Sequence, residues 1–216
     1  YAYPAAFPDD VIEVMASEPK ICKYLDIPFQ HISDAQLAAM HRRHTKAEAM
    51  ELIRRLRGAI PDLALRTTLL VGYSGETEAD FTELLDFVRE VRFDRLGVFA
   101  YSEEEGTYSA RELHDDIPEA VKQERVERIM ALQNGISLDN NRRRVGRTEQ
   151  VLIDSRQGDF YVGRTQYDSP EVDQEILIPA DERRLLRGHF YDVRITSAAD
   201  YDLYGTVVAK PRTGHR

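Results

Sequence analysis

The chain has 216 residues, 42% of them hydrophobic, and a formal net charge of −9 at pH 7. This length suits one large domain or two smaller ones with a real core, and the acidic balance argues against non-specific nucleic-acid binding, which depends on Lys and Arg. The single cysteine excludes a disulfide framework and, with no apolar run of about 20 residues, predicts a cytoplasmic protein that does not enter a membrane.

Helix and strand patterns alternate up to about residue 110. Helices are predicted over residues 8–15, 33–40, 45–57 and 77–88, where apolar residues recur at helical spacing behind capping residues. Strands are predicted over residues 24–29, 65–71 and 95–101, and the continuous run 65–71 is typical of a parallel strand buried on both faces. The alternation predicts parallel βαβ units.

The second part of the chain has a different pattern. A long helix is predicted from Ile117 to about Arg144, and Gly146 marks a boundary. Short strands follow at 150–154, 159–164, 175–178, 190–198 and 204–209, separated by Gly and Pro turns, which predicts a small closed β-barrel. We therefore predict an α/β domain over residues 1–145, which includes the connecting helix, and a β-barrel domain over residues 146–216.

A strand–turn–helix segment at residues 67–77 is the first candidate site. Gly72 and Gly75 allow the backbone to approach a ligand closely, and the N-terminus of the following helix offers free N–H groups. An ordinary βα turn would explain the same residues. Glu76 is also explained as an acid that complements the helix dipole.

Polar residues within or just after the other strands are further candidates. Gln30 and His31 follow a predicted strand, where barrel enzymes collect functional side chains, although a His in this place is often a packing residue. Arg66 lies within an apolar strand and needs an anionic partner, either a ligand carboxylate or an internal salt bridge. The acidic segment from Tyr101 to Thr107 follows the last strand, so it either faces a substrate or is a solvated loop.

These motifs together carry a resemblance to a known family. The segments Leu-Asp-Ile-Pro-Phe-Gln-His-Ile-Ser (25–33), Leu-Arg-Thr-Thr-Leu-Leu-Val-Gly (65–72) and residues 93–107 resemble radical S-adenosylmethionine (SAM) methylthiotransferases, in the branch that modifies the β-carbon of an aspartate of a small-subunit ribosomal protein. The resemblance implies part of a TIM-like radical SAM barrel followed by a five-stranded, OB-like TRAM barrel. Two departures are Ser74, where the family usually has proline, and His44, where glycine is common.

The resemblance also implies cofactors and roles. The family uses SAM and two [4Fe-4S] clusters, one of which cleaves SAM to a radical that abstracts hydrogen from the target carbon. The turn with Gly72, Gly75 and Glu76 fits the family pattern that touches the adenine side of SAM, and Gln30 and Arg66 are the other predicted cofactor-binding residues. The predicted substrate-facing residues follow from their places after strands and from charge: His31, Tyr101, Ser102, Glu105, Gly106, Thr107, Asp168, Glu171 and Asp173.

The cluster ligands are missing from this sequence. The family needs a Cys-x-x-x-Cys-x-x-Cys loop, whereas this chain has only Cys22 and opens at Tyr1 without Met or a signal-peptide pattern. We therefore expect a fragment cut inside the catalytic domain and inactive by itself. Missing barrel strands would leave open sheet edges, which predicts self-association.

The partner is predicted from charge. Residues 147–216 hold ten basic and twelve acidic side chains, whereas a tRNA-binding barrel should be basic. Acidic loops, one with Asp168, Glu171, Asp173 and Glu175 and one with Asp200 and Asp202, would attract a basic ribosomal protein. A tRNA methylthiotransferase and a non-catalytic protein-binding module are the two alternatives.

Overall fold

The computed structural model describes residues 2–180 and 184–208. The chain divides into two compact units, residues 1–133 and 134–216, and the division falls inside the long helix α6 (Glu119–Arg142). The sequence predicted a boundary at residue 145, whereas here residues 134–142 already belong to the second unit. Helix α6 therefore contributes side chains to both units.

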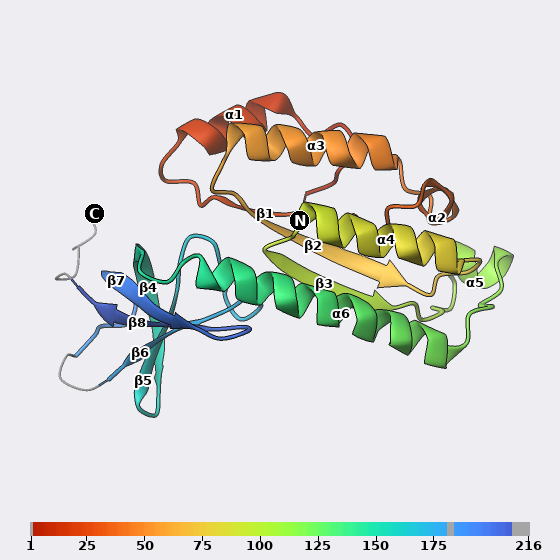
Figure 1. Cartoon of the computed structure of the whole chain (residues 1–216). Helices are drawn as coiled ribbons and strands as arrows, with labels where there is room; N and C mark the ends of the chain where they lie inside the picture. Colours follow the sequence, from red (N-terminus) through yellow and green to blue (C-terminus); the bar gives the residue numbers. More distant parts are fainter. Residues whose placement is uncertain (1, 181–183, 209–216) are drawn as a thin grey trace. The chain divides into compact units, whose positions relative to one another are not determined.

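The first unit holds a parallel three-stranded sheet and its helices (Figure 1). The strands are β1 (Tyr24–Asp26), β2 (Ala64–Val71) and β3 (Arg95–Ala100), in the spatial order β1-β2-β3. The helices are α1 (Asp9–Ser17), α2 (Asp34–Ala39), α3 (Lys46–Ala59), α4 (Glu78–Val91) and α5 (Tyr108–Glu112), together with the first part of α6. The predicted α/β alternation with parallel strands is confirmed.

Local sequence explains where the two main helices begin. Thr45 and Thr77 each accept a hydrogen bond from the backbone N–H three residues later, and the carboxylate at that position accepts one from the Thr N–H, so both α3 and α4 start with a capping box. Helix α4 ends at Arg92, which adopts a left-handed conformation. Figure 1 shows α3 and α4 on the same side of the sheet.

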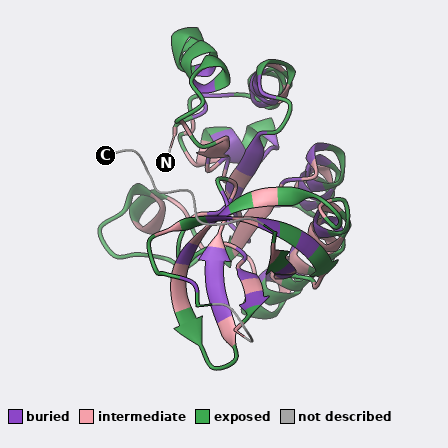
Figure 2. Cartoon of the chain, turned by 90° about the vertical axis from the view of Figure 1, so that its left-hand side faces the viewer, coloured by how far each residue is buried: buried purple, intermediate pink, exposed green. Residues whose placement is uncertain are grey.

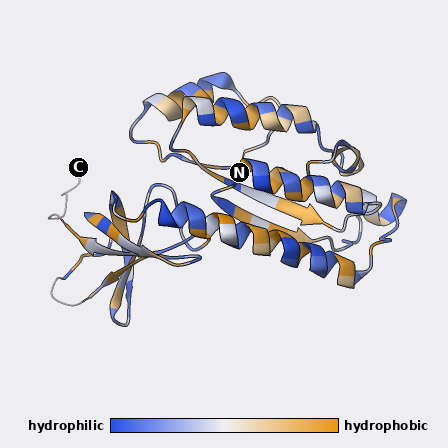
Figure 3. Cartoon of the chain, viewed as in Figure 1, coloured by the Kyte–Doolittle hydropathy of each residue, from blue (hydrophilic) through white to orange (hydrophobic). Residues whose placement is uncertain are grey.

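The two faces of β2 differ in burial. Leu65, Thr67, Leu69 and Val71 are buried, while Arg66, Thr68 and Leu70 are partly exposed. The prediction that this strand is buried on both faces is therefore wrong: only the face towards the helices is fully covered. Figure 3 shows that β2 becomes more apolar towards its carboxyl end.

Strand β1 is shorter than the sequence predicted. It ends at Asp26 instead of Phe29, because Pro28 has no N–H to donate to a ladder and Gln30 adopts a positive φ of 68°. A single parallel bridge between Gln30 and Leu69 continues the pairing beyond it. Strands β1 and β3 are the edges of this sheet, and self-association through them stays a prediction.

The second unit contains a closed five-stranded barrel with the order β4-β5-β6-β8-β7. Its strands are β4 (Thr148–Gln157), β5 (Phe160–Arg164), β6 (Ile176–Pro179), β7 (Phe190–Ala198) and β8 (Leu203–Val207). All pairs are antiparallel except β6 with β8. The predicted barrel is confirmed. The last predicted strand extended to Ala209, which lies outside the described residues.

The barrel core comes from alternating residues of its strands. Val151 and Ile153 of β4 and Val193 and Ile195 of β7 are essentially unexposed and pack together, as expected when every second side chain points inwards. In Figure 2 the buried stretches lie along the barrel strands and the turns are exposed. None of the helices in the described part of the chain is long and apolar enough to cross a membrane.

Candidate functional site

A cavity of about 300 Å³ lies near the carboxyl ends of the parallel strands. In barrels and open sheets of this kind, ligands bind at this end of the strands. The walls come from the chain after β1, the end of α2, the end of β2 and the start of α5. The lining residues are Gln30, Ala39, Met40, His41, Arg42, Leu70, Tyr73, Thr107, Tyr108 and Ser109.

The cavity wall formed by Gln30 is fixed by the backbone. The N–H of Gln30 donates to the carbonyl of Thr68 (2.9 Å), and its carbonyl accepts from the N–H of Leu70 (2.7 Å). Gln30 therefore lies beside the last residues of β2, and both its backbone N–H and its carbonyl are hydrogen-bonded. Gln30 is among the residues that line the cavity, and its contact with a ligand stays a prediction.

Arg42 is a cavity residue that the sequence reasoning did not select. Helix α2 ends with His41 in a left-handed conformation, and the N–H of Arg42 closes the turn on the carbonyl of Leu37 (2.8 Å). The Arg42 guanidinium lies 5.9 Å from the ring centroid of Tyr3, a cation–π distance. Within the described residues Arg42 has no carboxylate partner, so its charge is available to an anion.

The other wall of the cavity is aromatic. The rings of His41 and Tyr108 are 4.4 Å apart, and the rings of Tyr73 and Tyr101 meet edge-to-face at 4.9 Å. Burial raises the pKa of the Tyr73 phenol, so this residue stays neutral at physiological pH. The combination of flat rings and a guanidinium suits a ligand with both an aromatic and a charged part.

Arg66 already has a partner inside the protein. Its guanidinium forms an ion pair with Asp26 (2.5 Å), and both side chains are largely buried. Register explains the pair, because Asp26 of β1 lies directly beside Arg66 of β2. Arg66 does not line the cavity. Of the two partners that the sequence left open, the structure contains the internal salt bridge.

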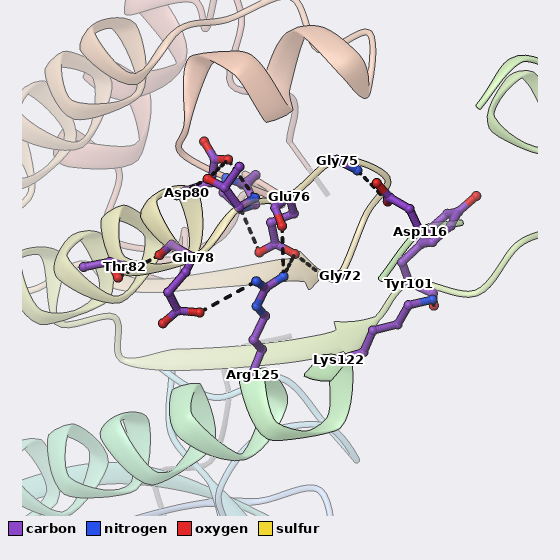
Figure 4. Close-up of polar contacts among 12 residues, drawn as sticks. Gly72, Gly75, Glu76, Glu78, Asp80, Thr82, Tyr101, Asp116, Lys122 and Arg125 are labelled. Atoms are coloured by element: carbon purple, nitrogen blue, oxygen red, sulfur yellow. Dashed lines mark hydrogen bonds and ion pairs between the residues drawn. The ribbon is translucent and has the colours of Figure 1, made fainter. Parts of the chain in front are cut away.

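The turn from Gly72 to Glu76 follows β2 and leads into α4 (Figure 4). Gly72 and Gly75 both have φ of 74°, a conformation that favours glycine. Glu76 is buried, accepts a hydrogen bond from the N–H of Gly72, and lies 3.1 Å from a guanidinium nitrogen of Arg125. Glu76 is therefore a buried ion-pair partner and does more than complement the helix dipole.

His31 also faces Glu76. Its Nδ1 accepts from the N–H of Ser33 (3.0 Å), so the proton is assigned to Nε2, which lies 3.4 Å from the Glu76 carboxylate. The imidazole is fully buried. In this arrangement His31 is a packing residue, the alternative that the sequence left open, and it does not face a substrate.

Two basic residues of α6 complete the surroundings of the turn. Arg125 binds Glu76, while Lys122 binds the carbonyl of Tyr101 (3.1 Å) and the carboxylate of Asp115 (2.6 Å). The sequence reasoning missed both. Their spacing could have predicted their burial. Lys122 and Arg125 lie seven and four residues before the buried Ile129, which places all three on the same helix face.

The segment after β3 is divided between core and surface. Tyr101 is buried, whereas Ser102, Glu105 and Gly106 are exposed. Thr107 caps α5 by accepting a hydrogen bond from the N–H of Ala110 (3.2 Å), and it lines the cavity. The segment therefore brings only Thr107 to the cavity among the residues that the sequence selected here.

The acidic residues of the barrel differ in exposure. Asp168 is buried, where it accepts hydrogen bonds from Thr165 and lies 3.8 Å from Arg144. Asp173 accepts from the N–H of Ser169 (2.8 Å) and is partly covered, while Glu171 is exposed. Asp168 therefore holds its own turn together, and Glu171 is the most accessible acid of the three.

The described residues offer no place for an iron–sulfur cluster. Cys22 is a free, exposed cysteine, and no group of three or more His, Cys, Asp or Glu side chains in the described ranges could hold a metal ion. A four-iron cluster is held by several thiolates. The donor set of this chain therefore does not fit a cluster.

Comparison with known families agrees with the two units. The family model of the radical SAM superfamily matches residues 3–88, and that of the TRAM domain matches residues 145–208. Among solved structures, coproporphyrinogen III oxidase (HemN) from Escherichia coli, a radical SAM enzyme, has a TM-score of 0.52 at 17% identity, covering 76% of this chain and 45% of that one. This likeness concerns the fold alone.

Curated relatives are much more similar in sequence. The ribosomal protein uS12 methylthiotransferase RimO of Phocaeicola vulgatus is 53% identical over 208 residues, which cover 96% of this chain and 48% of the relative. The protein of the same name from Porphyromonas gingivalis is 54% identical over 209 residues, with the same two coverages. The chain therefore spans about half the length of the curated relatives it matches.

Proposed function

We propose that this chain is part of an enzyme that adds a methylthio group to the β-carbon of an aspartate of protein uS12. It is a homologue of the uS12 methylthiotransferases named RimO and contains part of a radical SAM domain and a TRAM domain. The sequence-based resemblance to this family is confirmed. The observation that carries the proposal is the identity of 53% along 96% of the chain. A cytoplasmic location belongs to the same proposal.

The cavity residues fit the polar parts of SAM. The methionyl group of SAM carries a carboxylate, which the guanidinium of Arg42 would hold because no carboxylate among the described residues pairs with it, and Gln30 offers an amide beside it. The turn from Gly72 to Glu76 would contact the adenosyl part, as the family resemblance implies. Arg66 is the weaker candidate for the carboxylate because Asp26 already neutralises it.

The chemistry of the clusters is not assigned to this chain. The single exposed Cys22 cannot replace the thiolates that a [4Fe-4S] cluster requires. We therefore propose that these 216 residues bind and orient SAM and substrate but do not transfer sulfur by themselves. Cluster and radical chemistry would have to come from residues outside this sequence.

The barrel is the proposed docking unit for uS12. Two exposed acids in its loops, Glu171 and Asp200, would attract the basic ribosomal protein, and this attraction should weaken as salt rises. Asp168 has no such role here because its carboxylate is buried.

The test is a chimeric enzyme. The aligned half of RimO from Porphyromonas gingivalis is replaced by this chain, and the chimera is produced in cells of that species that lack their own copy. Mass spectrometry of uS12 should then show the mass of one added methylthio group. The matched variant Arg42→Gln, which removes the free charge of the cavity, should abolish the modification, whereas Arg43→Gln at the exposed neighbouring position should not.

Two results would contradict the proposal. A chimera that is folded and loaded with clusters but leaves uS12 unmodified would refute the assigned substrate. Methylthiolation of tRNA in the same cells would move the chain to the tRNA-modifying branch.

A second candidate, nucleic-acid binding, is favoured by one observation. Arg142, Arg143, Arg147 and Arg194 are exposed, and within the described residues none has a carboxylate partner. Arg194 lies opposite Thr148 in the barrel, one residue along the chain from Arg147. Titration of the whole chain with uS12 and with tRNA, each at low and high salt, separates the candidates, because salt-sensitive binding to tRNA alone would favour the second.

A further inference from the structure

Helix α6 carries two basic side chains that are almost completely buried. Lys122 is 2% exposed and Arg125 is 5% exposed. Lys and Arg are almost never fully buried unless they are paired, and both of these residues make polar contacts around one turn. That turn, Gly72 to Glu76, is the segment proposed to contact the adenosyl part of SAM (Figure 4).

Arg125 holds the last residue of the turn in place. Its guanidinium lies 3.1 Å from the carboxylate and 3.3 Å from the backbone carbonyl of Glu76. The same carboxylate oxygen accepts the N–H of Gly72, so the Glu76 carboxylate that Arg125 binds also joins the last residue of the turn to the first. Without Arg125, Glu76 would be a buried carboxylate facing only His31 and a backbone amide, which is costly.

Lys122 joins the carboxyl ends of two strands. Its aliphatic stem lies against Gly72, which follows β2, so closely that a Cβ on this glycine would come within 2.3 Å of the Lys122 Cγ. Its ammonium group donates to the carbonyl of Tyr101, which follows β3, and to the carboxylate of Asp115. Movement of either strand end would disturb these contacts.

The loop before α6 closes the same turn from outside. The carboxylate of Asp116 accepts the N–H of Gly75 (2.9 Å), and the carbonyl of His114 accepts the hydroxyl of Ser74 (2.7 Å). Residues 114–125 therefore hold the turn at Gly72, Ser74, Gly75 and Glu76.

We propose that Lys122 and Arg125 are positioning residues for the cofactor turn. Buried ion pairs add little net stability, but a binding site needs its backbone held within a fraction of an ångström. The two cations supply that restraint by fixing the N–H directions of the turn and the spacing of the ends of β2 and β3. The inference rests on the proposed function, in which this turn contacts SAM.

The experiment uses the whole chain with S-adenosylhomocysteine as the ligand. Binding of this SAM analogue does not require a bond between an iron–sulfur cluster and its sulfur atom. The variants are Lys122→Met and Arg125→Met, with Arg125→Lys as the conservative replacement. The control is Arg128→Met, on the same helix, whose ion pairs with Glu78 and Glu124 are largely exposed. Two quantities are measured well below the melting temperature of each variant: affinity by equilibrium dialysis, and hydrogen exchange of the amides of Gly72, Gly75 and Glu76.

The two Met variants should bind the analogue about tenfold more weakly or worse, as when other groups that orient ligand-binding residues are removed. Exchange of the turn amides should accelerate by a similar factor, while that of Leu69 within β2 should not change. Arg125→Lys should recover part of both losses, and Arg128→Met should match the wild type. If Arg125→Met does not fold, Lys122→Met and Arg125→Lys decide the question.

Unchanged affinity in folded variants would overturn the inference, even if the turn exchanged faster, because the residues would then be only structural. Failure of the wild type to bind S-adenosylhomocysteine would instead refute the proposed cofactor site on which the inference rests. The two failures are therefore distinguishable.

Discussion

Replacing Gly72 with Ala tests the close contact between the Gly72–Glu76 turn and α6. Gly72 and Gly75 have the same φ of 74°, but they differ in the space around them. A Cβ on Gly72 would meet Lys122 at 2.3 and 2.9 Å, whereas a Cβ on Gly75 would have no atom within 4 Å. Gly75→Ala is therefore a matched control with the same backbone strain and no steric overlap.

The magnitude follows from two contributions. A left-handed conformation costs a residue with a Cβ about 1–2 kcal/mol, and this cost applies to both variants. In Gly72→Ala the aliphatic stem of Lys122 must also move, and this movement disturbs the ion pair of its buried ammonium group. Breaking a buried ion pair outright costs about 3–5 kcal/mol of stability. We expect Gly75→Ala to destabilise the first unit by about 1–2 kcal/mol, and Gly72→Ala by more than this, up to about 4–7 kcal/mol if the ion pair is broken outright.

The assay is urea denaturation followed by NMR signals of residues in the first unit, because a chain of two units need not unfold in one step. Both glycine variants are measured in the wild-type and Lys122→Ala backgrounds as a double-mutant cycle. Lys122→Ala removes the obstructing Cγ and Cδ and keeps only the Cβ, which a Cβ on Gly72 would meet at 3.1 Å. The cost of Gly72→Ala should therefore fall most of the way to that of Gly75→Ala. Equal costs of the two glycine variants in the wild-type background, or an undiminished excess cost in the Lys122→Ala background, would refute the reasoning.

Two further predictions concern His44 and Asp168. Burial, and then the charge of Arg42, lower the pKa of His44, so the unfolded state takes up this proton first and the first unit should lose stability as the pH falls below about 6.5. His44→Phe should remove that part of the pH dependence in urea denaturation, and an unchanged pH profile would contradict the assignment. Asp168→Ala removes the carboxylate that accepts from the Thr165 hydroxyl and lies near the Arg144 guanidinium. It should therefore destabilise the second unit by about 1–3 kcal/mol. The control Glu171→Ala, at an exposed position, should change stability by less than about 0.5 kcal/mol. Similar effects of these two variants in urea denaturation would show that Asp168 has no structural role.

Most of the elements could be predicted because their signals are local. Thr45 and Thr77 predict the starts of α3 and α4 by capping, and alternating apolar residues predict the barrel strands to within three residues of their observed ends. The short helix α5 was missed because its five residues carry no apolar stripe and none of them is buried. Strand β1 was predicted too long because apolar Ile27 and Phe29 continue the pattern past Pro28.

The candidate site was less predictable because its decisive contacts join distant parts of the chain. The sequence identified Glu76 and the glycines of the turn but not Arg125, which lies 49 residues away and approaches through tertiary packing. On a helix with many charged residues, a pattern cannot tell a buried guanidinium from a solvated one. The cavity arginine, Arg42, was missed for a related reason: it follows the end of α2, and only the fold brings that end beside Gln30.

Arg42 and Arg66 differ in the interactions that each would lose if it bound a ligand carboxylate. A ligand carboxylate that bound Arg66 would have to share or displace Asp26, whose second oxygen is already buried without a hydrogen-bond partner. Displacement would leave a largely buried negative charge without its counterion, which typically costs several kcal/mol. A ligand at Arg42 gives up only water and a cation–π contact with Tyr3, worth about 0.5–1 kcal/mol at an exposed site. This comparison favours Arg42 in our proposal for the ligand carboxylate, whereas Arg66 neutralises Asp26 between neighbouring strands.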